Sequence, residues 1–310
     1  MYEKFYGFRV KPFGLAPQEE FLFLSRQHRM ALELLVSGLR NQAMFCVVSG
    51  DIGTGKTTLM RHLLSRRGSG NAVAMITGTS GTFTELLQWI LSELGVDYQG
   101  LDKIAMQSAL IQQLKWINAH DKRVVLIIDE AQSLAPEVLE EFRLFSNINA
   151  GSTMLLQTVL VGQLGLRAML RRLDMRPFAQ RIGVDYVLTP FDQEQTRAYI
   201  RHRLGVAAPG RQDLFTADAC DAVFAASRGI PRIINLFCDT ALVYGYADQK
   251  QTIDASTVNE MLNDKARDGG WLFQPSRPPR RAQALDRPAA SDKPPAADQG
   301  LSEDRTSPRS

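Results

Sequence analysis

The stretch GDIGTGKTT at residues 50–58 constrains the fold of this 310-residue chain more than any other feature. It fits the pattern G-x-x-x-x-G-K-[ST], with Gly50, Gly55, Lys56 and Thr57 at the fixed positions. The apolar run MFCVVSG leads into it and a helical pattern follows, which predicts a strand, a tight turn and a helix start. Backbone N–H groups of such a turn and the positive end of the helix dipole attract phosphate. The stretch therefore predicts a phosphate-binding loop for a nucleotide.

The residues of this loop are predicted to bind ATP and Mg²⁺. We expect Lys56 to reach the β- and γ-phosphates and the Thr57 hydroxyl to ligate Mg²⁺. The predicted cofactor-binding residues of the loop are Gly50, Asp51, Ile52, Gly53, Thr54, Gly55, Lys56, Thr57 and Thr58.

The second motif is VVLIIDEAQ, which places the acidic residues Asp129 and Glu130 at the end of an apolar strand. Open parallel sheets bind their ligands at the carboxyl ends of their strands. Asp129 is thus the expected second Mg²⁺ ligand, and Glu130 is the expected general base that polarises the attacking water. Together with the loop, this pair predicts nucleotide hydrolysis.

Five short apolar runs alternate with helical patterns, which predicts an α/β fold with a five-stranded parallel sheet flanked by helices. We expect these strands to be buried on both faces; they lie at 44–50, 72–77, 124–129, 155–162 and 184–189. After Pro190 the strands stop. The segment that begins with Asp192 and has Gln195 three residues later predicts a capped helix, and further helices follow. The chain therefore reads as an α/β domain followed by a small helical domain.

Composition excludes several other classes of protein. The chain is 45% hydrophobic and 22% charged, as in ordinary soluble proteins. Its apolar runs are shorter than the roughly 18 residues of a membrane span, and no secretory signal opens it, so we expect a cytoplasmic protein without a transmembrane segment. From Trp271 onward, a stretch with seven of the 14 prolines predicts a disordered tail. Residues 1–270 hold 29 cations and 28 anions, a near-neutral balance that disfavours a dedicated nucleic-acid-binding domain.

Cysteines and histidines are too scattered for a metal cluster or a histidine-based nucleophile. Cys46, Cys220 and Cys238 stand apart in apolar surroundings and are expected to be buried free thiols. The four histidines are His28, His62, His120 and His202, and none has the spacing of a ligand pair.

Several motifs together resemble the AAA+ ATPases of the ExeA/GspA type, which are associated with bacterial secretion. They are the phosphate loop, LIIDEAQSL, LLQTVLVGQ, the arginine-bearing AQRI, GIPRIINLFCDTAL and the opening segments MYEKFYGFRVKPFGLAP and FLFLSRQHRMAL. ATPases of pilus-assembly and exosortase or exopolysaccharide systems are similar. The resemblance implies a P-loop ATPase core with a small C-terminal helical lid. The implied division is an N-terminal segment that packs on the nucleotide site, an ATPase core, a lid and a Pro-rich tail, at 1–30, 31–191, 192–268 and 269–310.

The resemblance also implies roles for individual residues. Gln163 resembles the sensor 1 residue near the γ-phosphate, and Arg232 resembles sensor 2, the lid arginine that reaches the nucleotide. Pro12 and Phe13 resemble the segment that closes over the adenine. Secretion members of the family add a transmembrane helix and a periplasmic part, where this chain has its Pro-rich tail instead. The resemblance therefore covers the motor and not its periplasmic extension.

The segment RAMLRRLDMRPFAQRI at 167–182 holds five arginines. In the AAA+ family a helix in this place ends at a subunit interface, where an arginine finger reaches the neighbour's ATP. By this resemblance Arg181 is the first choice for the finger and Arg176 the second, while the remaining three are a solvated or interface face. The cluster thus predicts a homo-oligomer that associates through the Arg181 face.

Three functions remain open from the sequence. The favoured one is a Mg²⁺-dependent ATPase that powers assembly of an envelope system for secretion, pili or exopolysaccharide export, with partners at the inner membrane. The alternative is a DNA-binding ATPase of the TniB/MuB transposition type. A third is a nucleotide-dependent scaffold that hydrolyses ATP poorly, which the Asp129–Glu130 pair disfavours.

Overall fold

The structure, a computed structural model, describes residues 1–267 except 16–18, 66–70, 79–80, 148 and 151–152. Contacts join the described residues into one compact unit. The predicted tail lies outside the described residues. The finer division at 30/31 and 191/192 stays a prediction.

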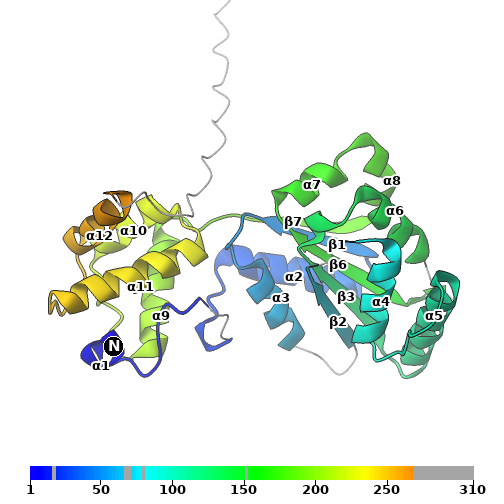
Figure 1. The fold of residues 1–310 in the computed structure, drawn as a ribbon, viewed down its shortest axis with the longest axis horizontal. Helices are drawn as coiled ribbons and strands as arrows, with labels where there is room; N and C mark the ends of the chain where they lie inside the picture. The colour runs from blue at the N-terminus through cyan, green and yellow to red at the C-terminus, as the bar shows by residue number, and fades with distance from the viewer. Residues whose placement is uncertain (16–18, 66–70, 79–80, 148, 151–152, 268–310) are drawn as a thin grey trace, which may run out of the picture. The chain divides into compact units, whose positions relative to one another are not determined.

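A five-stranded parallel sheet confirms the predicted α/β fold (Figure 1). Its strands lie in the order β2-β3-β6-β1-β7, so consecutive strands are joined by crossovers. The bounds are β1 Phe45–Gly50, β2 Asn71–Thr77, β3 Arg123–Asp129, β6 Leu156–Gly162 and β7 Ile182–Leu188. The carboxyl ends of β1, β3 and β6 therefore meet at one edge of the sheet, where the loop and the acidic pair lie.

Helices cover both faces of the sheet. Since the side chains of a strand point alternately to opposite faces, those of each central strand pack into two cores. In β3, Leu126 packs into the core with the helices from α4 to α8, and Ile127 packs into the core with α2 and α3. The bounds are α2 Arg26–Arg40, α3 Lys56–Ser65, α4 Phe83–Glu93, α5 Lys103–Ala119, α6 Pro136–Phe145, α7 Leu164–Leu170 and α8 Arg176–Ala179. Short 3₁₀ turns lie at η1 Glu19–Phe21, η2 Ala131–Ser133 and η3 Leu173–Met175.

The two edge strands correct the expectation of burial on both faces. β7 is exposed or half-buried from Ile182 to Val187, with Asp185 exposed, and is buried only at Leu188; β2 is also only partly buried. An edge strand has a neighbour on one side only, so less of it is covered. A small antiparallel pair, β4 Asn149–Ala150 and β5 Thr153–Met154, was not predicted from the sequence.

Four helices after Pro190 form a third core, as predicted. They are α9 Gln193–Ala207, α10 Ala217–Ser227, α11 Pro231–Ala247 and α12 Ala255–Arg267. The predicted capping box at the start of α9 is present: Gln195 N donates to Asp192 Oδ1 at 2.7 Å and Asp192 N donates to Gln195 Oε1 at 3.4 Å.

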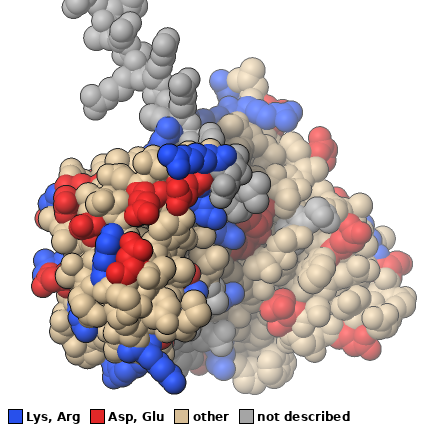
Figure 2. Space-filling model, turned by 60° about the vertical axis from the view of Figure 1, so that its left-hand side comes forward, with Lys and Arg blue, Asp and Glu red and all other residues tan. Residues whose placement is uncertain are grey.

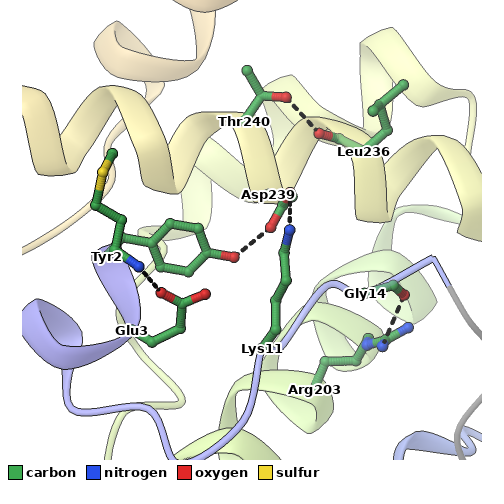
Figure 3. Close-up of polar contacts among 9 residues, drawn as sticks. Tyr2, Glu3, Lys11, Gly14, Arg203, Leu236, Asp239 and Thr240 are labelled. Atoms are coloured by element: carbon green, nitrogen blue, oxygen red, sulfur yellow. Dashed lines mark hydrogen bonds and ion pairs between the residues drawn. The ribbon is translucent and has the colours of Figure 1, made fainter.

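The first part of the N-terminal segment, with helix α1 (Tyr2–Tyr6), packs into this helical core. Figure 3 shows Tyr2 and Lys11 converging on Asp239 of α11; the Tyr2 hydroxyl donates to one carboxylate oxygen and Lys11 Nζ lies 2.8 Å from the other. Phe13 is 1% exposed and its ring lies 6.0 Å from that of Phe215. Phe13 thus has almost no surface to offer an adenine, which corrects the expected role of Pro12 and Phe13.

Arg203 of α9 fastens the same segment from the other side. Its Nε donates to Pro12 O at 2.6 Å and its Nη2 to Gly14 O at 3.4 Å, the contact drawn in Figure 3. Its Nη1 donates to Tyr199 Oη at 2.9 Å, and its guanidinium lies 4.6 Å from the centre of the Phe21 ring. Arg203 is 5% exposed, so carbonyl dipoles and aromatic faces take the place of water around its guanidinium.

Candidate nucleotide site

The phosphate loop joins β1 to α3, and two glycines give it its shape. Gly53 and Gly55 have φ of +83° and +96°, values that L side chains rarely adopt. Helix α3 begins at Lys56, so its free N–H groups open toward the loop. Ile52 is 59% exposed at the tip, whereas Thr54 is buried and its hydroxyl donates to Asp51 O at 2.9 Å. The local geometry is that of a phosphate cradle.

Lys56 is buried at the base of this cradle. Its Nζ donates to Gly50 O at 3.0 Å and to Asp51 O at 2.9 Å. Burial lowers the pKa of Lys56, and the carboxylates of Glu130 and Asp129 oppose that shift. The ammonium is therefore held at the point where the loop and the acidic motif meet, which suits a contact with phosphate.

Thr57 and Asp129 meet across the sheet edge. Thr57 Oγ1 donates to Asp129 Oδ2 at 2.6 Å, and Asp129 is 3% exposed. A hydroxyl and a carboxylate are the hard oxygen donors that Mg²⁺ prefers, and Mg²⁺ commonly uses one or two protein ligands together with phosphate oxygens. The residues present fit a Mg²⁺–nucleotide site.

Glu130 follows β3 in a left-handed conformation with φ of 57°. Such a backbone is uncommon for residues other than glycine and concentrates at functional sites. Gln132 Nε2 and Gln163 Nε2 both donate to Glu130 Oε2, the latter at 3.3 Å. Gln163 N in turn donates to Gln132 Oε1 at 2.9 Å. The structure thus brings the expected base and the expected sensor 1 residue into contact, and it adds Gln132, which the sequence analysis had not singled out.

Arg232, at the start of α11, lies against the outer side of the loop. Its N–H donates to Gly53 O at 3.3 Å, and a Cβ on Gly53 would lie 2.7 Å from the Cβ of Arg232. Arg232 thus contacts the loop through its backbone and its Cβ, and its role as sensor 2 stays a prediction.

His28 of α2 also touches the loop, a contact that was not predicted from the sequence. Its Nε2 lies 3.1 Å from Thr54 O and its Nδ1 lies 2.8 Å from Ser25 Oγ. The only local signal was the helix cap, in which Ser25 stands three residues before His28. Nothing in that spacing points to a loop 26 residues further on.

The arginine cluster divides into two groups. Arg167 pairs with Asp185 at 2.7 Å and Arg172 pairs with Asp174 at 2.6 Å. Arg171, Arg176 and Arg181 are exposed and make no ion pair with any residue that the structure describes. Exposed cations without an internal partner remain available to another molecule.

Within the described residues, no group of three or more His, Cys, Asp or Glu side chains is placed to hold a metal. Cys46, Cys220 and Cys238 are buried and free, and burial raises the pKa of the Cys46 thiol to about 12 and that of Cys220 to about 11. In the same described part, the longest and most apolar helices still fall short of what a membrane crossing requires.

Two sequence comparisons find relatives. Residues 39–170 match the family described as AAA domain. General secretion pathway protein A of Aeromonas hydrophila is 39% identical over 248 residues, which make up 80% of this chain and 45% of that protein. The chain therefore spans less than half the length of this curated relative.

Solved structures share the fold at low identity. Cdc6p of Pyrobaculum aerophilum superposes with a TM-score of 0.61 at 20% identity, covering 84% of this chain and 70% of that one. The ORC2 protein of Aeropyrum pernix, solved in ADPNP-ADP complexes, gives a TM-score of 0.59 at 17% identity, covering 76% of this chain and 66% of that one. With its phosphate loop and its acidic motif, the chain carries an AAA domain, and over 80% of its length it is similar to general secretion pathway protein A.

Proposed function

We propose that the chain hydrolyses ATP with Mg²⁺ and that this hydrolysis powers assembly of an envelope secretion or export system. The observation that carries the proposal is the meeting of Lys56, Thr57, Asp129 and Glu130 at the end of the sheet. These four supply the cation, the metal ligands and the base that phosphoryl transfer to water requires.

In this proposal the loop N–H groups and Lys56 hold the phosphates in line with the water. Thr57 and Asp129 would hold Mg²⁺, which neutralises charge on the β- and γ-phosphate oxygens when bound. Glu130 accepts a proton from the attacking water at its carboxylate. Gln163 and Gln132, which donate to Glu130 Oε2, fix the direction in which that carboxylate faces.

We further propose that Arg181 acts on the site of a neighbouring copy, with Arg176 as the second choice. Its exposure supports this, as does the absence of an ion pair to any described residue. An arginine finger stabilises negative charge on the transferring γ-phosphoryl group. The protein would then need to form a homo-oligomer in order to turn over.

The proposed location and partners rest on the similarity to a relative. Since General secretion pathway protein A is a curated relative, we propose a cytoplasmic ATPase that attaches at the inner membrane through a partner of an export machine. Capture from detergent-solubilised membranes by the Glu130→Gln variant with ATP tests this, with Lys56→Ala as the matched control. Equal capture by both variants would argue against a nucleotide-dependent partner.

The DNA-binding alternative lacks support from charge. Residues 1–270 are nearly neutral, and Figure 2 shows Lys and Arg beside Asp and Glu on the face turned forward. Electrophoretic mobility shift over a salt series decides it, because non-specific binding through several phosphates weakens steeply with salt. We expect no shift at low salt with or without ATP; a salt-sensitive shift would favour the transposition type.

The proposed activity is tested by phosphate release from ATP with and without Mg²⁺, by the wild type and by Lys56→Ala. We expect Mg²⁺-dependent release by the wild type and none above background by Lys56→Ala, whose nucleotide binding should also be lost. Release by Lys56→Ala at the wild-type rate would contradict the assignment of the loop.

A further inference from the structure

His28 is buried between the phosphate loop and the segment that leads into the helical part. The side chain is 4% exposed. A Cβ placed on Gly55 would lie 3.0 Å from His28 Nε2, so the imidazole lies directly against the loop backbone. The ring of Phe191, between β7 and α9, lies 5.8 Å away on another side. His28 therefore contacts both the loop and the connection between the two parts.

The hydrogen bonds of His28 determine its tautomer. Thr54 O is a carbonyl and can only accept, so His28 Nε2 carries the proton and donates to it at 3.1 Å. In a neutral imidazole Nδ1 is then an acceptor, and Ser25 Oγ donates to it at 2.8 Å. Burial lowers the pKa of His28, which keeps the neutral form at pH 7. Ser25 and Thr54 thus hold the ring in one orientation.

The hydrogen bond from His28 to Thr54 O also fixes the direction of the Gly55 N–H. In a planar trans peptide the C=O of one residue and the N–H of the next point in opposite directions. Since the Thr54 carbonyl points to His28, the Gly55 N–H points away from it, to the opposite side of the loop. The Gly53 carbonyl is held in the same way by Arg232 N at 3.3 Å. Two neighbouring carbonyls are thus tied to groups outside the loop.

We propose that His28 is a positioning residue of the nucleotide site, which holds the Thr54–Gly55 peptide so that the Gly55 N–H faces the phosphates. The inference rests on the proposed nucleotide function of the loop. It concerns binding and not the chemical step, because His28 touches neither Glu130 nor Asp129 in the described contacts.

Two substitutions at His28 test whether binding requires a hydrogen-bond donor at the position of Nε2, because one places a donor there and the other places it at the position of Nδ1. The amide nitrogen of Gln reaches about as far as Nε2, whereas that of Asn reaches only as far as Nδ1. His28→Gln should therefore keep the bond to Thr54 O, and its affinity for fluorescent ADP should stay within about threefold of the wild type. His28→Asn leaves a buried carbonyl unpaired and should weaken binding about tenfold. His202→Gln, at a histidine whose ring lies against Phe23, is the control and should bind like the wild type.

Steady-state kinetics distinguish positioning from loss of folded protein. His28→Asn should raise KM for ATP about tenfold with kcat within about threefold of the wild type, since the groups that act on the γ-phosphate are intact. A purely structural role would lower apparent kcat through a smaller folded fraction and leave KM unchanged. If His28→Asn does not fold, Ser25→Ala should raise the Kd for ADP about threefold, because the ring loses its partner at Nδ1.

The outcomes are separable from failure of the proposed activity, because ADP binding is measured without turnover. Equal affinity in wild type, His28→Asn and His28→Gln would overturn the role of His28, even if the protein hydrolyses ATP. Equal weakening in the Gln and Asn variants would also overturn it, since the donor at Nε2 would then not be what matters. Binding by the wild type without hydrolysis would instead contradict the ATPase proposal alone.

Discussion

Thr57 Oγ1 donates a 2.6 Å hydrogen bond to Asp129 Oδ2, although the two residues stand 72 positions apart in the chain. Thr57 lies in the first turn of the helix after β1, and Asp129 ends β3; β6 separates the two strands in the sheet. The parallel sheet thus brings two motifs that are distant in the sequence together in one site.

This pair predicts how hydrolysis depends on Mg²⁺. Asp129→Asn removes the negative charge of one proposed ligand and Thr57→Val removes the other ligand, so the Mg²⁺ concentration for half-maximal phosphate release should rise about tenfold or more. Thr57→Ser keeps the hydroxyl and is the matched control, with an expected wild-type Mg²⁺ dependence. Unchanged Mg²⁺ curves for both ligand variants would show that the ion is held elsewhere.

Arg181 is predicted to act on the neighbouring site. Arg181→Ala should leave ATP binding within about twofold of wild type and lower kcat about 1000-fold or more, the lower end of the range for an arginine finger. Arg171→Ala removes an equally exposed arginine of the same segment and should leave kcat unchanged. Turnover is measured at protein concentrations where the oligomer forms.

A mixing experiment tests whether Arg181 acts on the nucleotide site of a neighbouring copy. Arg181→Ala has an intact nucleotide site and Lys56→Ala has an intact finger, so mixing the two inactive variants should restore part of the activity. If Arg176→Ala shows the loss and Arg181→Ala does not, the finger is Arg176. Full activity in both variants would contradict a finger in this segment.

The buried Arg203 is predicted to stabilise the helical core by tying down the N-terminal segment. Arg203→Met keeps the apolar stem but loses the donors to Pro12 O and Gly14 O, and should lower the free energy of unfolding by about 2–3 kcal/mol. Arg201→Met, on the same helix, loses only an exposed ion pair with Asp213 and should change it by less than about 1 kcal/mol. Urea unfolding followed by circular dichroism measures both; equal effects would refute the anchoring role.

The lowered pKa of His28 predicts a loss of stability in mild acid. Burial holds this pKa below its ordinary 6.5, so below pH 6.5 the unfolded chain binds a proton that the folded protein does not. The free energy of unfolding should then fall with decreasing pH, by at most about 1.4 kcal/mol per pH unit for this one group. His202, whose pKa is lowered by burial and by Arg203, adds a change of the same sign. The slope between pH 6.5 and about pH 5 should be smaller in His28→Gln than in wild type; superimposable slopes would contradict this.

The fold was predictable from the sequence wherever the pattern was local. Apolar runs located all five strands, and helices bury the three central strands on both faces. The expectation of burial on both faces failed for the edge strands β2 and β7, since the number of neighbours of a strand is set by the order of the sheet and not by its own residues. The short β4–β5 pair, of two residues in each strand, was below what periodicity can detect.

The candidate site was predictable where a motif names its own residues, as for Lys56 and Asp129. The left-handed backbone of Glu130 and its contact with Gln132 arise from the turn after β3, for which the sequence has no glycine as a signal. The contact of His28 with Thr54 depends on how α2 packs beside the loop, and the burial of Phe13 depends on the helical core. Such tertiary contacts produce no local pattern that could be recognised in the sequence.

Parallel measurement of ATP binding and phosphate release by wild type and Glu130→Gln decides whether this site hydrolyses ATP with Glu130 as its base. We expect Glu130→Gln to bind ATP with wild-type affinity and to release phosphate at least about 100-fold more slowly, because the base that accepts the proton of the water is gone. Phosphate release by Glu130→Gln at the wild-type rate would contradict the assignment of Glu130 and the mechanism built on it.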